Sequence, residues 1–305
     1  MSEIGIKITK TLGYYWQRVL QILRGWYWNV SKPVLSRPVI IIGCSRAGTT
    51  LVYKTFSESE QLGTLQKETH DFWADLHPLQ ERGWDTHALR ASDACNKDLD
   101  AVSRYFFINT GKMRIVDKNN QNGLCIPYLL KLFPDACFVF VKRSPGDNIN
   151  SLIEGWGKAD EFATWSDEVP VDVNVENGKY KRWCFFLSNG WRNYVNSSVE
   201  EVCAFQYKSM NEEILKAKEL VPTEQWFEIK YEDILINPVE GFRQAFDYFK
   251  LAFSTHLQAH CETVLSNPYN AFSEIKKDKW KEGRNRERIE RVIPIVRDIA
   301  GRMGY

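Results

Sequence analysis

The segment that ends at residue 50 constrains the fold of this chain more than any other, because it has the pattern of a strand, a tight loop and a helix. Residues 38–43 form a short apolar, mostly β-branched run that ends in glycine, and an amphipathic stretch begins at Thr49. The connecting sequence, residues 43–50, is GCSRAGTT. A loop of this kind directs backbone N–H groups and the positive end of a helix dipole to one place, so the segment predicts an anion site.

The same alternation of strand and helix recurs along the chain. An apolar run at residues 137–141 lies between helical stretches at 123–133 and 147–156. This rhythm predicts an α/β fold, a single domain with a central parallel sheet flanked by helices and functional residues at the strand ends. Further strands are expected at residues 62–66, 114–116 and 226–229, and long helices at 180–197, 199–220 and 286–303.

The composition excludes several classes of protein. The 305 residues include 40 Lys and Arg against 39 Asp and Glu, and this balance argues against nucleic acid as a partner. Seven cysteines without a C-x-x-C spacing or a Cys/His cluster indicate neither a disulfide framework nor a zinc site, and favour a reducing compartment. Residues 14–28, the longest apolar stretch, contain two arginines, so we expect no transmembrane segment and a cytoplasmic protein.

We place the domain at residues 37–305 and an N-terminal amphipathic helical extension at residues 1–36. Residues 5–30 have apolar side chains at helical spacing, with Lys and Arg between them. A helix docked on the domain is the favoured interpretation, and a flap over a substrate pocket or a membrane-surface helix are the alternatives. Residues 157–177 and 267–284 are aperiodic and are expected to form loops.

The loop at residues 43–50 has the spacing of a nucleoside triphosphate loop without its lysine. Thr49 stands where a P-loop kinase has the Lys that reaches the β and γ phosphates, and Arg46 lies inside the loop instead. Such a loop suits a terminal phosphate or sulfate without a metal. A P-loop kinase of a small molecule and a non-catalytic nucleotide-binding protein remain the other interpretations.

A second candidate phosphate site follows the apolar run at 137–141. Arg143 at the strand end would offer a fork of N–H donors, and Ser151, eight residues later on the next helix, would add a hydroxyl. Together with the first loop, this segment resembles the 5′-phosphosulfate and 3′-phosphate motifs of sulfotransferases that use 3′-phosphoadenosine 5′-phosphosulfate (PAPS).

The resemblance covers residues 38–305 and implies PAPS as co-substrate, 3′-phosphoadenosine 5′-phosphate (PAP) as its product, and no metal. It places the nucleotide on the two motifs and on a late basic loop. The implied nucleotide-binding residues are Arg46, Ala47, Gly48, Thr49, Thr50, Arg143, Ser151, Lys279, Lys281, Gly283 and Arg284.

Residues 67–73, KETHDFW, resemble a segment of the heparan sulfate branch of this family, in which the Glu is the general base. The resemblance therefore implies Glu68 as the base, and His70 is the other candidate because imidazole titrates near neutrality. Lys118 lies in a turn similar to the family's lysine turn, although Asn119 and Asn120 replace Thr-Pro. Lys118 and Arg46 would offset charge on the sulfuryl and bridging oxygens.

The expected reaction is in-line transfer of a sulfuryl group to a hydroxyl or amine. A near-neutral chain offers no track for a polyanion, which favours a small-molecule acceptor, a metabolite or natural product, over a carbohydrate chain. The same tryptophans that would bind the acceptor could equally belong to the core. The acceptor candidates are Trp73, Trp156, Trp165 and Trp183, with residues 157–177.

Overall fold

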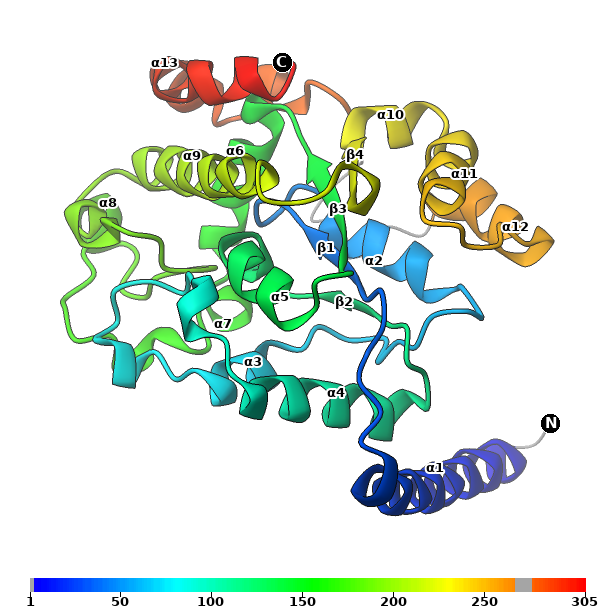
Figure 1. Cartoon of the computed structure of the whole chain (residues 1–305). Helices are drawn as coiled ribbons and strands as arrows, with labels where there is room; N and C mark the ends of the chain where they lie inside the picture. The colour runs from blue at the N-terminus through cyan, green and yellow to red at the C-terminus, as the bar shows by residue number, and fades with distance from the viewer. Residues whose placement is uncertain (1–2, 267–275) are drawn as a thin grey trace.

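A four-stranded, all-parallel sheet with the order β2-β1-β3-β4 forms the centre of the molecule (Figure 1). The computed structural model describes residues 3–266 and 276–305, with side chains from residue 13 onward. The chain forms the single α/β domain that the alternation of strands and helices predicts. The strands are β1 (Val39–Ile42), β2 (Val116–Lys118), β3 (Cys137–Lys142) and β4 (Trp226–Lys230).

Helices cover both faces of this sheet and its ends. The longer ones are α1 (Glu3–Ser31), α2 (Thr49–Ser57), α3 (His70–Leu76), α4 (Asn96–Thr110), α5 (Ile126–Leu132), α6 (Pro145–Trp156), α9 (Val199–Lys218), α10 (Tyr231–Ile236), α11 (Pro238–Tyr248), α12 (Thr255–Thr263) and α13 (Arg286–Arg302). Shorter turns are α7 (Ala159–Phe162), α8 (Val175–Gly178), η1 (Gln80–Arg82), η2 (Ala91–Asp93), η3 (Asn122–Leu124), η4 (Ser166–Glu168), η5 (Trp191–Tyr194), η6 (Thr223–Gln225) and η7 (Lys279–Glu282).

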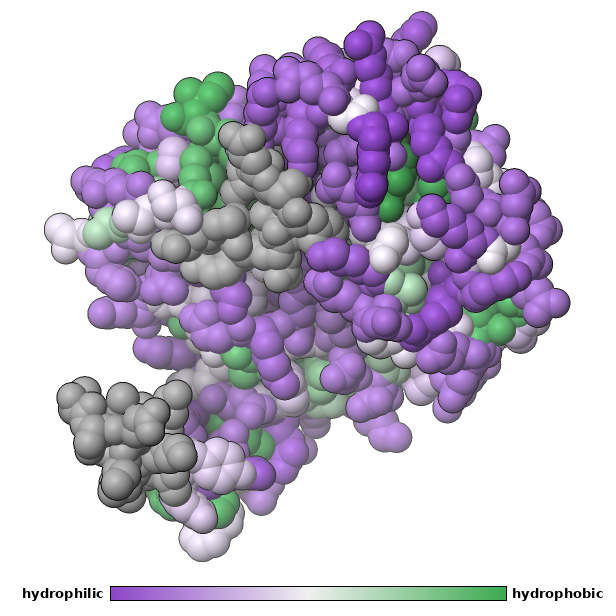
Figure 2. All heavy atoms as spheres, turned by 180° about the vertical axis from the view of Figure 1, so that it is seen from behind, coloured by the Kyte–Doolittle hydropathy of each residue, from purple (hydrophilic) through white to green (hydrophobic). Residues whose placement is uncertain are grey.

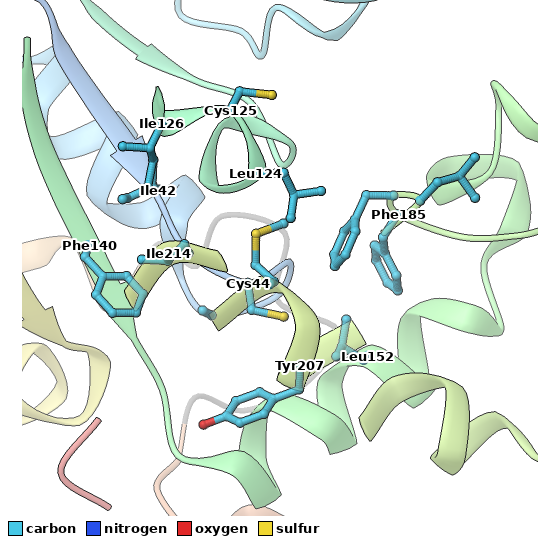
Figure 3. Close-up of a cluster of buried hydrophobic side chains, with 14 of the residues drawn as sticks. Ile42, Cys44, Leu124, Cys125, Ile126, Phe140, Leu152, Phe185, Tyr207 and Ile214 are labelled. Carbon is cyan, nitrogen blue, oxygen red and sulfur yellow. The ribbon is translucent and has the colours of Figure 1, made fainter. Parts of the chain in front are cut away.

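The core has two parts, one on each face of the sheet, because alternate side chains of a strand point to opposite faces. Val39 and Ile41 of β1 pack with residues of α2, α11 and α12. Ile40 and Ile42 pack on the other face with residues of α4, α5, α6, α9 and α13. Burial on both faces explains why these strands are apolar runs and do not alternate with polar residues. Figure 3 shows part of the larger cluster, with Ile42, Cys44, Phe140, Leu152, Tyr207 and Ile214.

The strands predicted at 38–43, 137–141 and 226–229 are confirmed, and the strand expected at 114–116 lies two residues later. The strand expected at 62–66 is wrong, since Gly63 makes only an isolated bridge with Ile115. Local polar contacts replace the strand there: Thr64 Oγ1 accepts the backbone N–H of Gln66, and Gln66 has a φ of 57°. Side chains that bond their own backbone compete with sheet pairing in this way.

The long helix expected at 180–197 is also wrong. The segment is irregular up to η5, and Phe185 and Gly190 have φ values of 71° and 83°, which an α-helix cannot contain. Long-range contacts hold it in place, since His87 donates its backbone N–H to the carbonyl of Leu187 and accepts the Leu187 N–H on Nδ1. The helices expected at 199–220 and 286–303 are confirmed as α9 and α13.

The register of the sheet brings together the three loops that follow β1, β2 and β3. Ile41 of β1 lies beside Lys118 of β2, and Ile42 lies beside Phe140 of β3. The loops that follow β1, β2 and β3 therefore leave the same edge of the sheet, the carboxyl edge, where open α/β sheets bind ligands.

The N-terminal helix α1 is present and packs against α4 on one side. The buried Trp28 lies against Phe107, with ring centroids 6.3 Å apart, and Gln21 donates to Asn109. In Figure 1 the N-terminal part of α1 extends away from the rest of the chain. None of the helices within the described residues is both long enough and apolar enough to cross a membrane.

Candidate active site

A cavity of about 520 Å³ opens at the carboxyl edge of the sheet. The loop after β1 contributes Arg46 to its lining, and the segment before α3 contributes Glu68. Lys118, the last residue of β2, and Arg143, the first residue after β3, also line it. Residues predicted from separate motifs are therefore neighbours in space. Thr49, Thr50, Gly48, Ser151, His70 and Lys279 also line this cavity.

The loop between β1 and α2 has the geometry of an anion cradle. Gly48 caps α2 with a φ of 98°, and a Cβ there would lie 2.3 Å from the ring of Tyr231, so only glycine fits. Ser45 is 5% exposed, and its Oγ has no hydrogen-bond partner among the described residues. A buried hydroxyl in the cavity lining, beside a helix N-terminus, is suited to an anion oxygen.

Two guanidinium groups and one hydroxyl join the two phosphate motifs. Arg143 donates to the backbone oxygen of Arg46 at 2.7 Å, and Arg46 Nε donates to Ser151 Oγ at 3.3 Å. Burial and then the nearby charge of Arg143 lower the pKa of Arg46 to about 10. The buried Nε of Arg143 has no hydrogen-bond partner within the described residues. Two like charges held together with a spare donor match a phosphate-containing ligand, which would relieve their repulsion.

Both carboxylate oxygens of Glu68 are engaged. Lys118 Nζ donates to Oε1 at 2.6 Å and Thr50 donates to the same oxygen at 3.2 Å, while His70 Nε2 lies 2.5 Å from Oε2. Burial by itself would raise the pKa of Glu68, but the Lys118 ammonium and the His70 ring outweigh it and hold this pKa well below its usual value. Glu68 is therefore an ionised carboxylate at neutral pH.

The other ring nitrogen of His70 also has a partner. Its Nδ1 lies 2.9 Å from Asn119 Oδ1, which accepts the backbone N–H of Gln121 as well. Both nitrogens of His70 are thus used within the site. Lys118 and Thr50 both donate to Oε1 of Glu68, so Oε2, which faces His70, keeps a lone-pair position for an incoming proton.

A buried carboxylate that the sequence analysis missed holds the base segment on the sheet. Asp117 of β2 accepts from Thr69 at 2.7 Å, from Trp73 Nε1 at 3.0 Å and from Asn122 at 3.3 Å. Burial raises the pKa of Asp117, and these donors counter it. Since Thr69 lies between Glu68 and His70, Asp117 fixes both. Its place next to Lys118 in a strand was the only signal available in the sequence.

Comparison with known proteins assigns the family. A family model described as the sulfotransferase family matches residues 38–255. The chain belongs to the sulfotransferase family. The family that the sequence predicts is thereby confirmed. No curated protein matches the chain.

Solved sulfotransferase structures share the fold of this chain. Sulfotransferase STF9 from Mycobacterium avium is 15% identical with a TM-score of 0.52, covering 90% of this chain and 80% of that one. The sulfotransferase domain from the Synechococcus PCC 7002 olefin synthase is 15% identical with a TM-score of 0.51, covering 89% and 96%. At such identities the likeness concerns the fold alone.

The late basic loop of the sulfotransferase reaches the cavity through one of its four expected residues. Lys279 lines the cavity and lies 4.0 Å from Glu154, and the carboxylate of Asp147 holds η7 by accepting the backbone N–H groups of Asp278 and Trp280. Residues 267–275, part of the expected loop, lie outside the described residues. Within the described chain, Lys281, Gly283, Arg284 and Ala47 are not in the cavity lining.

The cavity also has aromatic side chains in its lining. Trp73 and Trp165 line it as expected, and Trp84, which the sequence analysis missed, lines it too. Trp156 and Trp183 are fully buried in the core and lie outside the lining, so their place as acceptor residues is wrong. The polar lining there includes His77, whose Nε2 lies 3.1 Å from Asp98 and 3.3 Å from the hydroxyl of Tyr128.

Among the described residues, no three side chains of His, Cys, Asp or Glu gather around a point where a metal ion could bind. The cations that line the sulfotransferase cavity are Lys118, Lys279, Arg46, Arg82 and Arg143, and its carboxylates include Glu68. This donor set fits an anionic nucleotide, because amines and guanidinium groups bind phosphate and sulfate directly.

Proposed function

We propose that this sulfotransferase uses PAPS to sulfate a hydroxyl or amine of a small-molecule acceptor, with Glu68 as the general base. One observation carries the proposal: Glu68 and Lys118 share a single cavity with Arg46 and Arg143. A base, a cation for developing charge and two phosphate-binding groups are thereby within reach of one ligand. PAPS supplies the activated sulfuryl group, and PAP is the leaving group.

The nucleotide would be held at its two ends by different motifs. The N–H groups of the loop after β1, with Ser45, Thr49 and Thr50, suit the 5′-phosphosulfate. Arg143 and Ser151 suit the 3′-phosphate. The buried, unpartnered Ser45 Oγ and Arg143 Nε support this assignment, since within the described residues each is a donor that the fold itself does not satisfy.

Glu68 would take the proton from the acceptor as the acceptor oxygen or nitrogen attacks. A depressed pKa keeps Glu68 ionised, and one lone-pair position stays open on it. His70 is less suited, because Asn119 and Glu68 occupy its two nitrogens. It would act by orienting Glu68. Lys118 and Arg46 would stabilise negative charge on the sulfuryl and bridging oxygens, an effect that contributes a few kcal/mol per group, or roughly a hundredfold in rate.

The aromatic side chains in the cavity lining support an acceptor with an apolar or planar body. Trp73, Trp84, Trp165 and Phe185 all belong to this lining. Aromatic side chains offer a large apolar surface, which suits rings and hydrocarbon. A metabolite or natural product that carries one reactive hydroxyl or amine fits this lining best.

The test is direct detection of sulfuryl transfer. The protein is incubated with PAPS and a panel of phenols, aliphatic alcohols and amines, and mass spectrometry measures PAP and sulfated products. Parallel reactions contain ATP and Mg²⁺, which a P-loop kinase would use. The proposal predicts PAP and a sulfated product that are both reduced in the Glu68→Gln variant. A phosphorylated product from ATP would contradict it.

A further inference from the structure

The helix α1 exposes an apolar face to solvent. Of the 15 large apolar side chains that are exposed in the described part of the chain, nine lie on this one helix. In Figure 2 apolar side chains lie on the projecting helix at the lower left of the view. The nine residues are Tyr14, Tyr15, Trp16, Val19, Ile22, Leu23, Trp26, Tyr27 and Val30.

An amphipathic helix usually turns its apolar stripe toward the domain, but α1 turns its polar side toward α4 and its apolar stripe toward solvent. The side toward α4 carries Gln21, Arg24 and Trp28, where Gln21 bonds Asn109 and Arg24 donates to the backbone oxygen of Ile108. Residues 15, 19, 22, 23, 26 and 30 follow helical spacing on another face, and Trp26 and Val30 are 70% and 87% exposed. The contact with α4 therefore leaves the apolar stripe uncovered.

The charge of this segment differs from that of the remaining chain. Residues 1–32 contain five cations, Lys7, Lys10, Arg18, Arg24 and Lys32, against one acid, Glu3, and no further acid occurs before Glu58. Subtracting these from the chain totals of 40 and 39 leaves 35 cations and 38 acids in residues 33–305. A net charge of +4 is thus concentrated on and beside α1, while the rest of the chain carries −3.

Charge and composition together identify the occupant of this face. Two copies of α1 placed face to face would bring two sets of excess positive charge together, which opposes a homodimer through this surface. An anionic lipid surface instead attracts the cations and accepts the apolar side chains. Trp and Tyr are the aromatic residues that prefer the membrane–water interface. Five of the nine exposed residues are of these two types: Tyr14, Tyr15, Trp16, Trp26 and Tyr27.

We propose that α1 binds the surface of an anionic membrane, lying in its plane with the exposed apolar face among the lipid headgroups and acyl chains. The helix would hold the sulfotransferase domain at that surface through α4. This binding is independent of the proposed reaction, because none of the residues that line the cavity belongs to α1 within the described chain.

The test is sedimentation of the full chain with lipid vesicles. Vesicles of phosphatidylcholine alone are compared with vesicles that contain phosphatidylglycerol, at low and at high salt. We expect the protein to sediment with the anionic vesicles and to be released as salt rises, since screening weakens the charge attraction. Emission from Trp16 and Trp26, both exposed in the free protein, should shift to shorter wavelength on binding.

Variants distinguish binding through α1 from nonspecific adsorption of the protein to vesicles. Replacing Leu23 and Trp26 by Ser should lower the vesicle partition coefficient by more than about tenfold, because both side chains supply apolar area to the lipid. Ile236→Ser on α10, where the side chain is 78% exposed, should change nothing. Circular dichroism and thermal unfolding should match the wild type in both variants, since all three side chains are exposed.

Three outcomes would overturn the proposal. They are an absence of binding to anionic vesicles, equal binding to neutral ones, and equal binding of the Leu23/Trp26 variant and the wild type. Analytical ultracentrifugation of the same samples without lipid covers the other occupant. A dimer that the Leu23/Trp26 variant loses would assign the face to a second copy and not to a membrane.

Discussion

The Lys118 ammonium lies 2.6 Å from one carboxylate oxygen of Glu68, in a position where the side chain of Lys118 is only 7% exposed. Removing one partner of a buried ion pair leaves the other charge uncompensated and strongly destabilises the folded protein. The two residues therefore depend on each other. The pair also unites the end of β2 with the segment before α3. The chemistry proposed for the cavity rests on this contact.

Replacing Glu68 by Gln tests its role as the base. We expect turnover to fall by about two to four orders of magnitude, because the amide cannot accept the acceptor proton. PAP affinity should change little. Steady-state kinetics with PAPS and an acceptor that the wild type sulfates, and calorimetric titration with PAP, measure the two effects. Glu161→Gln, which alters another carboxylate of the cavity lining, is the matched control and should retain most activity. Unchanged turnover in Glu68→Gln would rule out the assignment.

The pH dependence follows from the same pair. The pKa of Glu68 is depressed in the folded protein, so its carboxylate stays ionised as pH falls below the usual range of a glutamate. The acid limb of kcat/KM that belongs to Glu68 should accordingly lie below about pH 4.3, the unperturbed value. In Lys118→Met, the ammonium group that lowers the pKa of Glu68 is removed, so the effect of burial would raise this pKa. The acid limb should then move to higher pH, and an identical pH–rate profile in both proteins would contradict the account.

The pair also affects stability in a defined direction. Since the folded pKa of Glu68 lies below its unfolded value, ionised Glu68 stabilises the fold above the unfolded pKa. This contribution is lost as pH falls from the unfolded pKa toward the folded one. Thermal unfolding from pH 7 to pH 3 should therefore show a steeper loss of stability in the wild type than in Glu68→Gln. Parallel curves would mean that the pair does not couple to folding.

Arg143 distinguishes PAP from AMP if it binds the 3′-phosphate. In Arg143→Ala we expect PAP affinity to fall by roughly 10- to 150-fold, which corresponds to the about 1.5–3 kcal/mol of a hydrogen bond to a charged group. Affinity for AMP, which lacks the 3′-phosphate, should change much less. Isothermal titration calorimetry with both nucleotides gives the ratio. An equal loss for the two ligands would show that Arg143 acts on the fold or on the 5′ end.

A substitution of Gly48 should disturb the geometry of the loop after β1. Gly48→Ala would hold a residue with a side chain at a φ of 98° and press its Cβ against Tyr231. The conformation alone costs about 1–2 kcal/mol, and PAP binding should weaken with it. Gly301→Ala on α13 has nothing within 4 Å of its Cβ and should be neutral or slightly stabilising. Thermal unfolding of the two variants, with and without PAP, makes the comparison. Equal behaviour would remove the strain argument.

Local sequence carried enough information for the two phosphate motifs. A strand, a glycine-rich loop and a helix are adjacent in the chain, so the geometry around Gly48 and Arg143 follows from short-range pattern. Glu68 and Lys118 were placed by resemblance to the family, and the structure brings them within 2.6 Å.

The aromatic part of the cavity lining could not be predicted in the same way. Trp84 lies in an irregular segment whose position depends on distant partners, since Trp191 Nε1 donates to its backbone oxygen. Residues 180–197 have apolar side chains at intervals that imitate a helix, yet they are buried in an irregular path. Spacing along the chain reports which residues are buried, but it does not report which distant segment buries them.

The measurement that tests the central claim most directly is calorimetric titration of the wild-type protein with PAP, AMP and ATP with Mg²⁺. PAP carries both phosphates that the cavity is proposed to bind, so it should bind without a metal and by far the most tightly of the three. AMP should bind weakly and ATP with Mg²⁺ no better. Tight binding of ATP with Mg²⁺ and none of PAP would contradict the account.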